Sequence, residues 1–589
     1  MSLFSRMFEK SRKPQEAAKP AEAVAVPAVV PTAASGAPIR LVVWGLDGIF
    51  WPGALQDGPV AVREEMCALV RALAARGIAS SICARHRLED VEPALTGAGI
   101  WTQFVQPSLA LSPVGPRLAA LAAALDVPAE SILFVDDKPR NRAQTAYFVP
   151  GIRVGGSDSL ADLLEQAVPD ADPATALERL RARPPASSPG DVTPFLRTLG
   201  ITVTIDYDIV PHIDRAVALI KRADALNFTG LRLRPDPVRA AAHLRGALSR
   251  FSTQAGLVHV RDNVTDYGYC GFYLLRTTPE GRRLTHFCFS DDLLDLGVET
   301  WLYRRLGRPD IAIDGTGLPD ILADRRPIDW IGLSMPDAPS GQAPIDSLYA
   351  SGGSDLAAIV HYFDMLGVRS RCQSDLVRDG AALALAHSVI ARYAIDGIGA
   401  AALDALLPLG FVASDFTPLP AGPKLWLLSF WMDAQATVWR HRSTGALVPY
   451  RARRPGDEDD EDSDSADEQA RRAYLKLNFE PLGVIDADLF KENVTALLHH
   501  AGPAARVVIL LMNEVRPAPD RHGDLVIAQN QAVNAWTRDV AAAHPNVELL
   551  NIADFAASPR EIGKANHFAR MVYVRIYQHL LKTYQPEAT

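Results

Sequence analysis

The sequence predicts an α/β, multidomain fold, and three observations support this class. The chain has 589 residues, more than a single hydrophobic core organises. In two stretches, beginning near residues 40 and 344, short apolar runs typical of buried strands alternate with segments of helical periodicity. Between them, a helix precedes three successive strand-like runs, which is typical of an α+β domain with an antiparallel sheet.

Residues 1–38 are predicted to precede the first folded domain as a tail and linker. Prolines break any helix between residues 14 and 38, a stretch rich in Ala and Val. The basic N-terminal residues are not followed by an apolar segment, so they are not expected to form a signal peptide. Two interpretations of these first residues stay open: a disordered tail, or a short basic amphipathic helix that touches a membrane weakly.

The first folded domain is expected at residues 39–168, where strands and helices alternate as in a parallel sheet. The expected strands are 39–46, 78–83 and 132–136, and the expected helices are 62–76, 88–98 and 115–125. A second domain at 190–330 is expected to hold helices 212–225 and 297–306 and strands 256–261, 268–276 and 283–289.

The third domain, residues 344–589, returns to the alternating pattern. Its expected strands are 346–351, 424–430, 505–511 and 547–551, with helices between them. The acidic run at 456–469 interrupts the pattern, and like charges in a block predict a disordered, solvated insertion. An electrostatic gate or a partner-binding tail is the alternative interpretation of this run.

Composition excludes several classes of function. The net charge of -9 argues against nucleic acid as a partner, because phosphate binding needs clustered Lys and Arg. The five cysteines form no CxxC pair, which argues against a disulfide framework and a zinc site and favours a reducing, cytoplasmic location. No apolar run is long enough to span a bilayer. We expect no metal and no cofactor.

Two motifs in the first domain resemble those of a known family. VVWGLDGIFWPG at 42–53 and FVDDKPRNR at 134–142 resemble the first and last motifs of the haloacid-dehalogenase-like (HAD-like) domain in FkbH-type proteins. The resemblance continues through residues 191–205 and 226–233 and covers about residues 40–310. It implies a HAD-like Rossmannoid domain followed by a GNAT-like, acyltransferase-like domain. Members of that family load a glyceryl unit onto a carrier protein.

The resemblance also shows what the first domain lacks for phosphoryl transfer. The nucleophile position, normally Asp, is Gly45, while the acid position is kept as Asp47. The phosphate-contacting Ser aligns with Ala84, and the Lys position falls near Val114. Asp136 and Asp137 remain. Without a carboxylate at 45 there is no phosphoaspartyl intermediate, so we expect a degenerate site whose acids cap turns.

The GNAT-like segment is degenerate as well. In CoA-binding relatives this region binds a pyrophosphate, but here it reads SDDLLDLGVE at 290–299, and its carboxylates repel an anion. A structural or carrier-docking role is therefore expected. Asp266 and His286 are candidate reactive groups, or satisfied structural ones.

The third domain contains a pattern typical of nucleophilic catalysis. SLYASGGSDLAAIVHYF at 347–363 predicts a strand, a Gly-Gly turn and then Ser354 at the start of a helix, where helix-terminal N–H groups converge. Asn513 ends a later apolar strand, and His567 precedes the last helix. The three blocks resemble those of SGNH hydrolases, which implies a flavodoxin-like α/β fold.

That resemblance implies catalytic roles for Ser354, His567 and Asn513. His567 would take the proton of Ser354, and the N–H groups of Gly353 and Ser354 with the Asn513 amide would hold the oxyanion. The family usually carries an Asp three residues before the His, but this chain has Lys564 there. Asp554 or a backbone carbonyl is a candidate substitute. The alternatives are a helix-capping Ser, a core His and a strand-end Asn.

The sequence therefore favours an SGNH-type esterase or O-acyltransferase that acts on a small acyl ester of a saccharide, a polyketide or a carrier-bound group. An acyl carrier protein is a further candidate partner, with the FkbH-like half as a recognition module. Two rival hypotheses stay open: a non-catalytic scaffold, and residual glyceryl transfer or phosphatase activity in residues 40–310.

Overall fold

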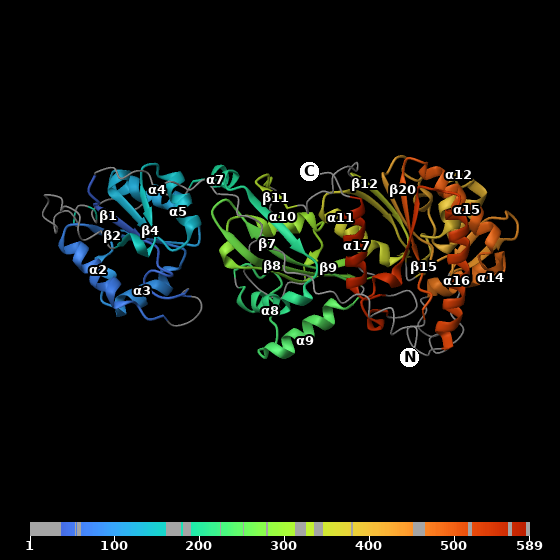
Figure 1. Ribbon diagram of the computed structural model, residues 1–589, viewed down its shortest axis with the longest axis horizontal. Coiled ribbons are helices and arrows are strands. Elements are labelled where there is room, and N and C mark those ends of the chain that lie inside the picture. The colour runs from blue at the N-terminus through green and yellow to red at the C-terminus, as the bar shows by residue number, and fades with distance from the viewer. Residues whose placement is uncertain are drawn as a thin grey trace. The chain divides into compact units, whose positions relative to one another are not determined.

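The computed structural model describes most of the chain, and for a few residues, among them Ser354, it describes the backbone alone. The described residues are 37–53, 55, 60–160, 178, 180, 190–223, 225–250, 252–278, 281–311, 326–334, 345–378, 381–450, 466–515, 521–562 and 568–584. They form an α/β protein with two parallel sheets and two further sheets (Figure 1). By its contacts the chain divides into two compact units, Met1–Leu199 with Asp262–Thr265, and Gly200–Arg261 with Asp266–Thr589.

The first unit is built on a five-stranded parallel sheet with the order β3-β2-β1-β4-β5, the order of Rossmann-type folds. Its strands are β1 Leu41–Trp44, β2 Ala79–Ala84, β3 Ser108–Leu109, β4 Ile132–Val135 and β5 Arg153–Gly155. Its helices are α2 Glu64–Ala75, α3 Leu88–Gly97, α4 Val114–Leu125, α5 Pro139–Phe148 and α7 Thr193–Thr198. Both faces of β1 are buried, with Val42 and Trp44 in one core and Leu41 and Val43 in another, which is why the strand is uniformly apolar.

The second unit opens with a six-stranded sheet of order β10-β9-β8-β7-β6-β11, whose four central strands are antiparallel. Its strands are β6 Ile201–Asp206, β7 Thr253–Arg261, β8 Asp266–Thr278, β9 Gly281–Phe289, β10 Asp310–Ile311 and β11 Ile331–Leu333. Its helices are α8 Ile213–Arg222, α9 Pro237–Leu248 and α10 Val298–Arg305. The two helices and three strands predicted for this domain are confirmed as α8, α10, β7, β8 and β9.

A second parallel sheet follows, with the order β13-β12-β16-β20-β21. Its strands are β12 Ser347–Ser351, β13 Arg369–Gln373, β16 Leu425–Ser429, β20 Arg506–Leu511 and β21 Val547–Asn551. Its helices are α11 Ser354–Met365, α12 Ser388–Asp396, α13 Ala400–Leu406, α15 Ala487–Ala501, α16 Arg521–Ala541 and α17 Arg570–Thr583. This is the doubly wound order of flavodoxin-like folds, in which the direction of winding reverses between the first and third strands, here β12 and β16.

A further antiparallel sheet, of order β14-β15-β18-β17-β19, was not predicted from the sequence. Its strands are β14 Leu376–Arg378, β15 Ala381–Leu383, β17 Thr437–His441, β18 Leu447–Tyr450 and β19 Phe479–Val484. They come from two insertions that flank β16, and most have only three to five residues. Such short segments carry too few alternations of apolar and polar residues to be recognised without their partners.

The prediction of a disordered segment at 456–469 was wrong at its C-terminal end. Helix α14 spans Ala466–Asn478 and includes the last four residues of that segment. Glu468 in its first turn is buried, and it accepts hydrogen bonds from Tyr450 Oη at 3.0 Å and from Arg472 Nε at 2.9 Å. These partners stabilise a carboxylate that the sequence shows only as part of a charge run. Residues 451–465 lie outside the described part of the chain, as do residues 1–36 of the tail predicted at 1–38.

Hydrogen bonds join the six-stranded sheet to the C-terminal parallel domain within the second unit. Arg570, at the start of α17, is fully buried and donates to the carbonyls of Leu248 at 3.2 Å and Tyr207 at 2.9 Å. His361 of α11 lies 3.1 Å from Arg282 Nη2 and 3.3 Å from Tyr273 Oη. The two predicted domains therefore fold against each other as one unit, with α11 and α17 at their contact.

No helix in the described ranges is long and apolar enough to cross a membrane. All five cysteines are described, and each is a thiol rather than half of a disulfide; four of them are buried.

Candidate active site

The carboxyl end of β12 leads to the candidate nucleophile, Ser354. After β12 the chain makes the Gly352–Gly353 turn, and α11 begins at Ser354. Gly352 N donates to the carbonyl of Gln373 at 3.1 Å, which ties the turn to the end of β13. In doubly wound sheets, ligands bind outside the carboxyl ends of the strands where the winding reverses. Ser354 follows the strand on one side of that reversal, as its sequence pattern predicted.

Close packing explains why the turn consists of two glycines. A Cβ atom at Gly353 would overlap the indole ring of Trp431, which follows β16. A Cβ atom at Gly352 would lie 2.9 Å from Cβ of Ser429 and 2.7 Å from Cγ of Leu356, both closer than real side chains allow. The turn that leads to Ser354 is therefore fitted against the end of β16, and only glycine permits this approach.

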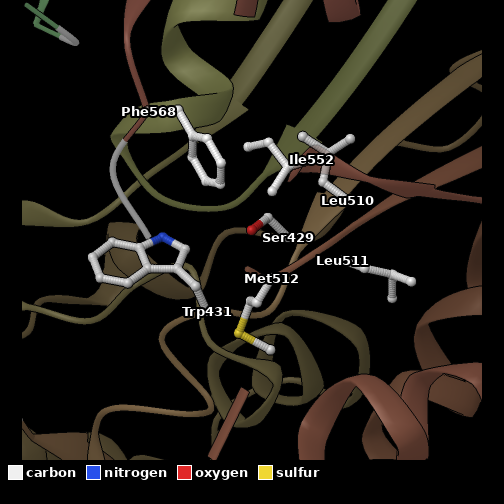
Figure 2. Close-up of a pocket in the computed structure, with 7 residues that line it drawn as sticks. All are labelled: Ser429, Trp431, Leu510, Leu511, Met512, Ile552 and Phe568. Atoms are coloured by element: carbon white, nitrogen blue, oxygen red, sulfur yellow. The ribbon is translucent and has the colours of Figure 1, made fainter. Parts of the chain in front are cut away.

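A small cavity lies beside this turn. It has a volume of about 10 Å³. Its lining comes from the ends of β16 and β20, from the short helix Ile552–Phe555 and from the segment just before α17: Ser429, Trp431, Leu510, Leu511, Met512, Ile552 and Phe568. Figure 2 shows the rings of Trp431 and Phe568 on one side, with the Ser429 hydroxyl pointing toward them. Sequence analysis did not anticipate this cavity, because its walls come from four distant segments.

Asn513 lies at the end of β20, as predicted, two residues after Leu511, and its side chain is fully buried. Its Nδ2 donates to the carbonyl of Val515 at 2.7 Å, and its Oδ1 accepts from Val515 N at 3.0 Å. These bonds close a turn at the strand end, which is the structural alternative considered for this residue. The Nδ2 atom carries a second hydrogen, so an oxyanion role stays a prediction.

Two asparagines of α16 fix this strand end and were missed from the sequence. Asn534 Oδ1 accepts from Met512 N at 3.0 Å, and its Nδ2 donates to the Met512 carbonyl at 2.9 Å and to Glu514 Oε1 at 2.8 Å. Asn530 Nδ2 donates to the Asn513 carbonyl at 2.8 Å. Their spacing of four residues puts both on one face of α16. Two buried amides at that spacing in an amphipathic helix were the available signal.

A buried His–Asp pair also lies beyond β16. Nδ1 of His387 is 3.3 Å from Oδ1 of Asp433, and both side chains are completely buried. Both Asp433 oxygens accept from Ser388 N, at 3.1 and 3.2 Å, and His387 Nδ1 accepts from Val389 N at 3.1 Å. Burial raises the pKa of Asp433 to about 7 and lowers the pKa of His387 to about 3. With no exposed surface, the pair positions the start of α12 against the β16 turn.

The structure describes only some of the other residues predicted for this site. His567 and Lys564 lie outside the described residues. Asp554, the candidate replacement for the missing carboxylate, is exposed, and its Oδ1 accepts from Asn551 Nδ2 at 3.2 Å. Phe568, the residue after His567, is buried at the cavity, and its N–H donates to Tyr573 Oη at 3.3 Å.

In the first unit, the space of the expected phosphatase nucleophile is filled. Gly45 follows β1, and a Cβ atom there would lie 2.8 Å from Cγ of Asp136. Asp136 is buried, and Asn141 Nδ2 and Lys138 N donate to its carboxylate at 3.1 and 2.8 Å. Burial raises the pKa of Asp136 to about 6, against the effect of these donors. No side chain fits at position 45 unless Asp136 moves.

The retained acid, Asp47, is held by its own neighbours. Its Oδ1 accepts from Trp51 Nε1 at 2.9 Å and from Leu55 N at 3.2 Å, and it lies 3.1 Å from His86 Nε2. Burial raises the pKa of Asp47, but the interactions with His86 and the hydrogen bonds from Trp51 and Leu55 together outweigh burial and hold the pKa below its usual value. Asp137 has its pKa raised by burial.

Ala84 and Val114, the positions aligned with a phosphate-binding Ser and Lys by resemblance alone, end β2 and begin α4, and Arg117 organises this region. Its guanidinium is buried and donates to the carbonyls of Ala84 at 3.0 Å, Ser108 at 2.7 Å and Pro113 at 3.2 Å. This region therefore contains a cationic side chain, but each nitrogen of the Arg117 guanidinium already donates to a backbone carbonyl. Sequence analysis did not identify it.

These residues do not fit a Mg²⁺ site of the kind that HAD-like phosphatases use. Mg²⁺ needs oxygens that converge in near-octahedral geometry. Oδ1 of Asp47 already has three polar neighbours, and the Asp136 carboxylate is bound by Asn141 and Lys138. Among the described residues, no group of three His, Cys, Asp or Glu side chains lies close enough to hold a metal ion.

The candidate groups of the six-stranded sheet are structurally satisfied or buried. Asp266 Oδ1 accepts from Gly268 N at 2.8 Å and pairs with His259 Nε2 at 3.1 Å. His286 is buried, and burial with His243 nearby lowers its pKa to about 4. In the segment 290–299, whose carboxylates were expected to repel a pyrophosphate, Ser290 Oγ caps a short turn by accepting from Asp292 N at 3.4 Å.

The sequence matches no protein-family model. It also matches no curated protein.

Among solved structures, the chain is similar to the N-terminal part of the protein BF1531 from Bacteroides fragilis, described as containing a phosphatase domain complexed with Mg. The two are 19% identical with a TM-score of 0.19, over 26% of this chain and 42% of that one. The chain thus spans less than half of that protein. It is also similar to 3-deoxy-D-manno-octulosonate 8-phosphate phosphatase from Yersinia pestis, with 17% identity and a TM-score of 0.17, over 26% of this chain and 90% of that one.

Replacing Gly45 by Ala should destabilise the first unit through Asp136. We expect a loss of about 1–3 kcal/mol from overpacking, measured by hydrogen exchange of the β1 and β4 peptides. In an Asp136→Ala background the loss should shrink, giving a coupling energy of at least about 1 kcal/mol. Gly97→Ala is the matched control, because a Cβ atom there meets nothing within 4 Å. Equal losses in both backgrounds would contradict the account.

Asp433 should make stability depend on pH. Its pKa is about 7 in the folded chain against 3.8 for an ordinary Asp, so the folded state keeps the proton to higher pH. Its stabilising contribution is complete below about pH 4 and is lost as the pH rises through 7. In urea unfolding between pH 4 and 8, the stability of the wild type relative to Asp433→Asn should show this decline, because the lowered pKa of His387 acts in the opposite direction in both proteins. The stability of the wild type relative to Asp404→Asn, a change at an exposed residue, should stay constant. An unchanged profile in Asp433→Asn would refute the assignment.

Proposed function

We propose that the C-terminal α/β domain is an SGNH-type serine esterase or O-acyltransferase that acts on a small acyl ester. One observation carries the proposal: Ser354 starts α11 directly after β12, beside the point where the winding of a flavodoxin-like sheet reverses. The order of Ser354, Asn513 and His567 along the chain supports it, since that order resembles the blocks of SGNH hydrolases.

The start of α11 supports acyl transfer for an electrostatic reason. The first N–H groups of a helix have no partner within the helix, and together with the helix dipole they stabilise negative charge. A tetrahedral intermediate on Ser354 would place its oxyanion near these groups, including the N–H groups of Gly353 and Ser354. The close fit of Gly353 against Trp431 holds this turn in place before any substrate binds.

The reaction would proceed in two halves. Ser354 Oγ attacks the carbonyl carbon of the ester, and its proton passes to His567. The bond between that carbon and the alcohol oxygen breaks, and the alcohol leaves with the proton from His567. Water or an acceptor hydroxyl then attacks the acyl-serine, gives its proton to His567, and releases Ser354 as that proton returns to Oγ. Hydrolysis and transfer differ only in this acceptor.

The first unit and the six-stranded sheet would then serve recognition, as a degenerate HAD-like domain and a GNAT-like domain of FkbH type. The side-chain space at Gly45 is filled by Asp136, and Asp47 is bound by Trp51 and His86, which argues against phosphatase or glyceryl-transfer chemistry. A saccharide or a carrier-bound group would supply the ester, and an acyl carrier protein is a candidate partner for this half.

A non-catalytic scaffold is the second candidate, and two observations favour it. Lys564 replaces the carboxylate that usually orients the catalytic His, which can cost orders of magnitude in rate. The Asn513 amide is already engaged with Val515. Under this hypothesis the strand-end glycines and the His387–Asp433 pair would serve only to shape a binding surface.

Ser354→Ala separates the two candidates. We expect hydrolysis of p-nitrophenyl acetate by the full chain to fall by at least about 10³-fold in this variant, because removing the nucleophile leaves only residual catalysis. Circular dichroism should show an unchanged fold. Ser351→Ala, three residues earlier at the end of β12, is the matched control and should keep its activity. Equal turnover in wild type and Ser354→Ala would support the scaffold.

A further inference from the structure

We propose that the cavity beside the Ser354 turn selects the acyl group, and that this group is acetyl. The inference rests on the proposed esterase or acyltransferase function and adds its substrate class, the acetyl esters of alcohols. It is carried by the position, volume and lining of the cavity.

The position of the cavity follows from Trp431. Its indole ring occupies the space in which a side chain at Gly353 would begin, and the same residue lines the cavity. Ser429, also in the lining, lies against Gly352, where an added Cβ atom would be 2.9 Å from Cβ of Ser429. The cavity therefore adjoins the turn that carries the nucleophile.

The volume limits what can enter. A cavity needs on the order of 10–15 Å³ to hold one water molecule, and this one has about 10 Å³. A methyl group is the acyl substituent nearest to that size. The second and third carbons of a butyryl chain would have to displace side chains that are already packed, which interiors resist.

The lining suits a methyl group and excludes longer chains. Leu510, Met512, Ile552 and Phe568 are each no more than 5% exposed, so they cannot swing into solvent to make room. Trp431 is only partly buried and forms the side nearest the turn. Met512 is the most adaptable of these side chains, but Asn534 binds its backbone N–H and carbonyl and fixes where its side chain starts.

Other features of the molecule support no comparable proposal. The buried His387–Asp433 pair has no exposed surface. The open hollow between Arg506, Glu548 and Tyr584 has a volume of about 330 Å³, but no observation indicates what would fill it. The Asp206–Tyr269 hydrogen bond, with His212 and His259 beside the Tyr269 ring, forms a polar cluster, but no observation indicates a ligand for it.

The test is the acyl-chain dependence of ester hydrolysis. We would measure kcat/KM of the full chain for p-nitrophenyl acetate, propionate, butyrate and hexanoate, and subtract the rate of Ser354→Ala for each ester. We expect acetate to exceed butyrate by on the order of 10²-fold, since each methylene that a pocket cannot accept costs roughly tenfold or more. Equal rates for acetate and butyrate, both dependent on Ser354, would overturn the inference and leave the proposed function standing.

Enlarging the cavity should shift the selectivity. Met512→Ala should raise the butyrate-to-acetate ratio by on the order of tenfold, and Ile552→Val, a smaller change, should raise the propionate-to-acetate ratio if Met512→Ala does not fold. Leu498→Ala is the matched control, since Leu498 is buried in α15 of the same domain and does not line the cavity. An unchanged ratio in both folded cavity variants would also overturn the inference. If no ester is hydrolysed in a Ser354-dependent way, the proposed function itself fails.

Discussion

The fit of Gly353 against the Trp431 indole is the contact on which the candidate site depends. It joins the first and third strands of the C-terminal parallel sheet at the point where the winding reverses. Because position 353 has no side chain, the β12 turn can approach the end of β16 closely enough for α11 to begin at Ser354. The same indole closes one side of the small cavity. The place of the nucleophile and the room for its acyl group thus follow from one packing constraint.

The surrounding structure holds both strand ends in place. Asn530 and Asn534 bind the backbone after β20, and Asp433 binds the start of α12 to the turn after β16. On the other side of the sheet, Arg570 of α17 ties the domain to the carbonyls of Tyr207 and Leu248. These are buried polar groups with partners, and such groups give a site rigidity more than stability. In the first unit, by contrast, Asp136 fills the space at Gly45, and the packing there has closed around the lost nucleophile.

Much of the fold was predictable because long apolar strands and amphipathic helices carry their period in the local sequence. The strands later labelled β1, β12, β16 and β20 and the helices α2, α3 and α4 lie within a few residues of their predicted bounds. The antiparallel sheet from β14 to β19 was not predictable, since its strands are short and pair across long insertions. The positions of Ser354 and Asn513 at strand ends were predictable because strand-end motifs are local. Trp431, Asn534, Arg117 and the His387–Asp433 pair were missed because their roles exist only through contacts between distant segments.

The account can be tested most directly by reacting the full chain with a small fluorophosphonate and mapping the adduct by peptide mass spectrometry. A nucleophilic Ser354 at the start of α11 should be the labelled residue, and a Trp431→Phe variant, which keeps an aromatic ring on Gly353, should still be labelled. Labelling should fall sharply in Gly353→Ala, because the added methyl group collides with the indole and displaces the turn. An adduct on another serine, or no adduct on the folded wild-type chain, would contradict the claim that this strand junction forms a serine active site.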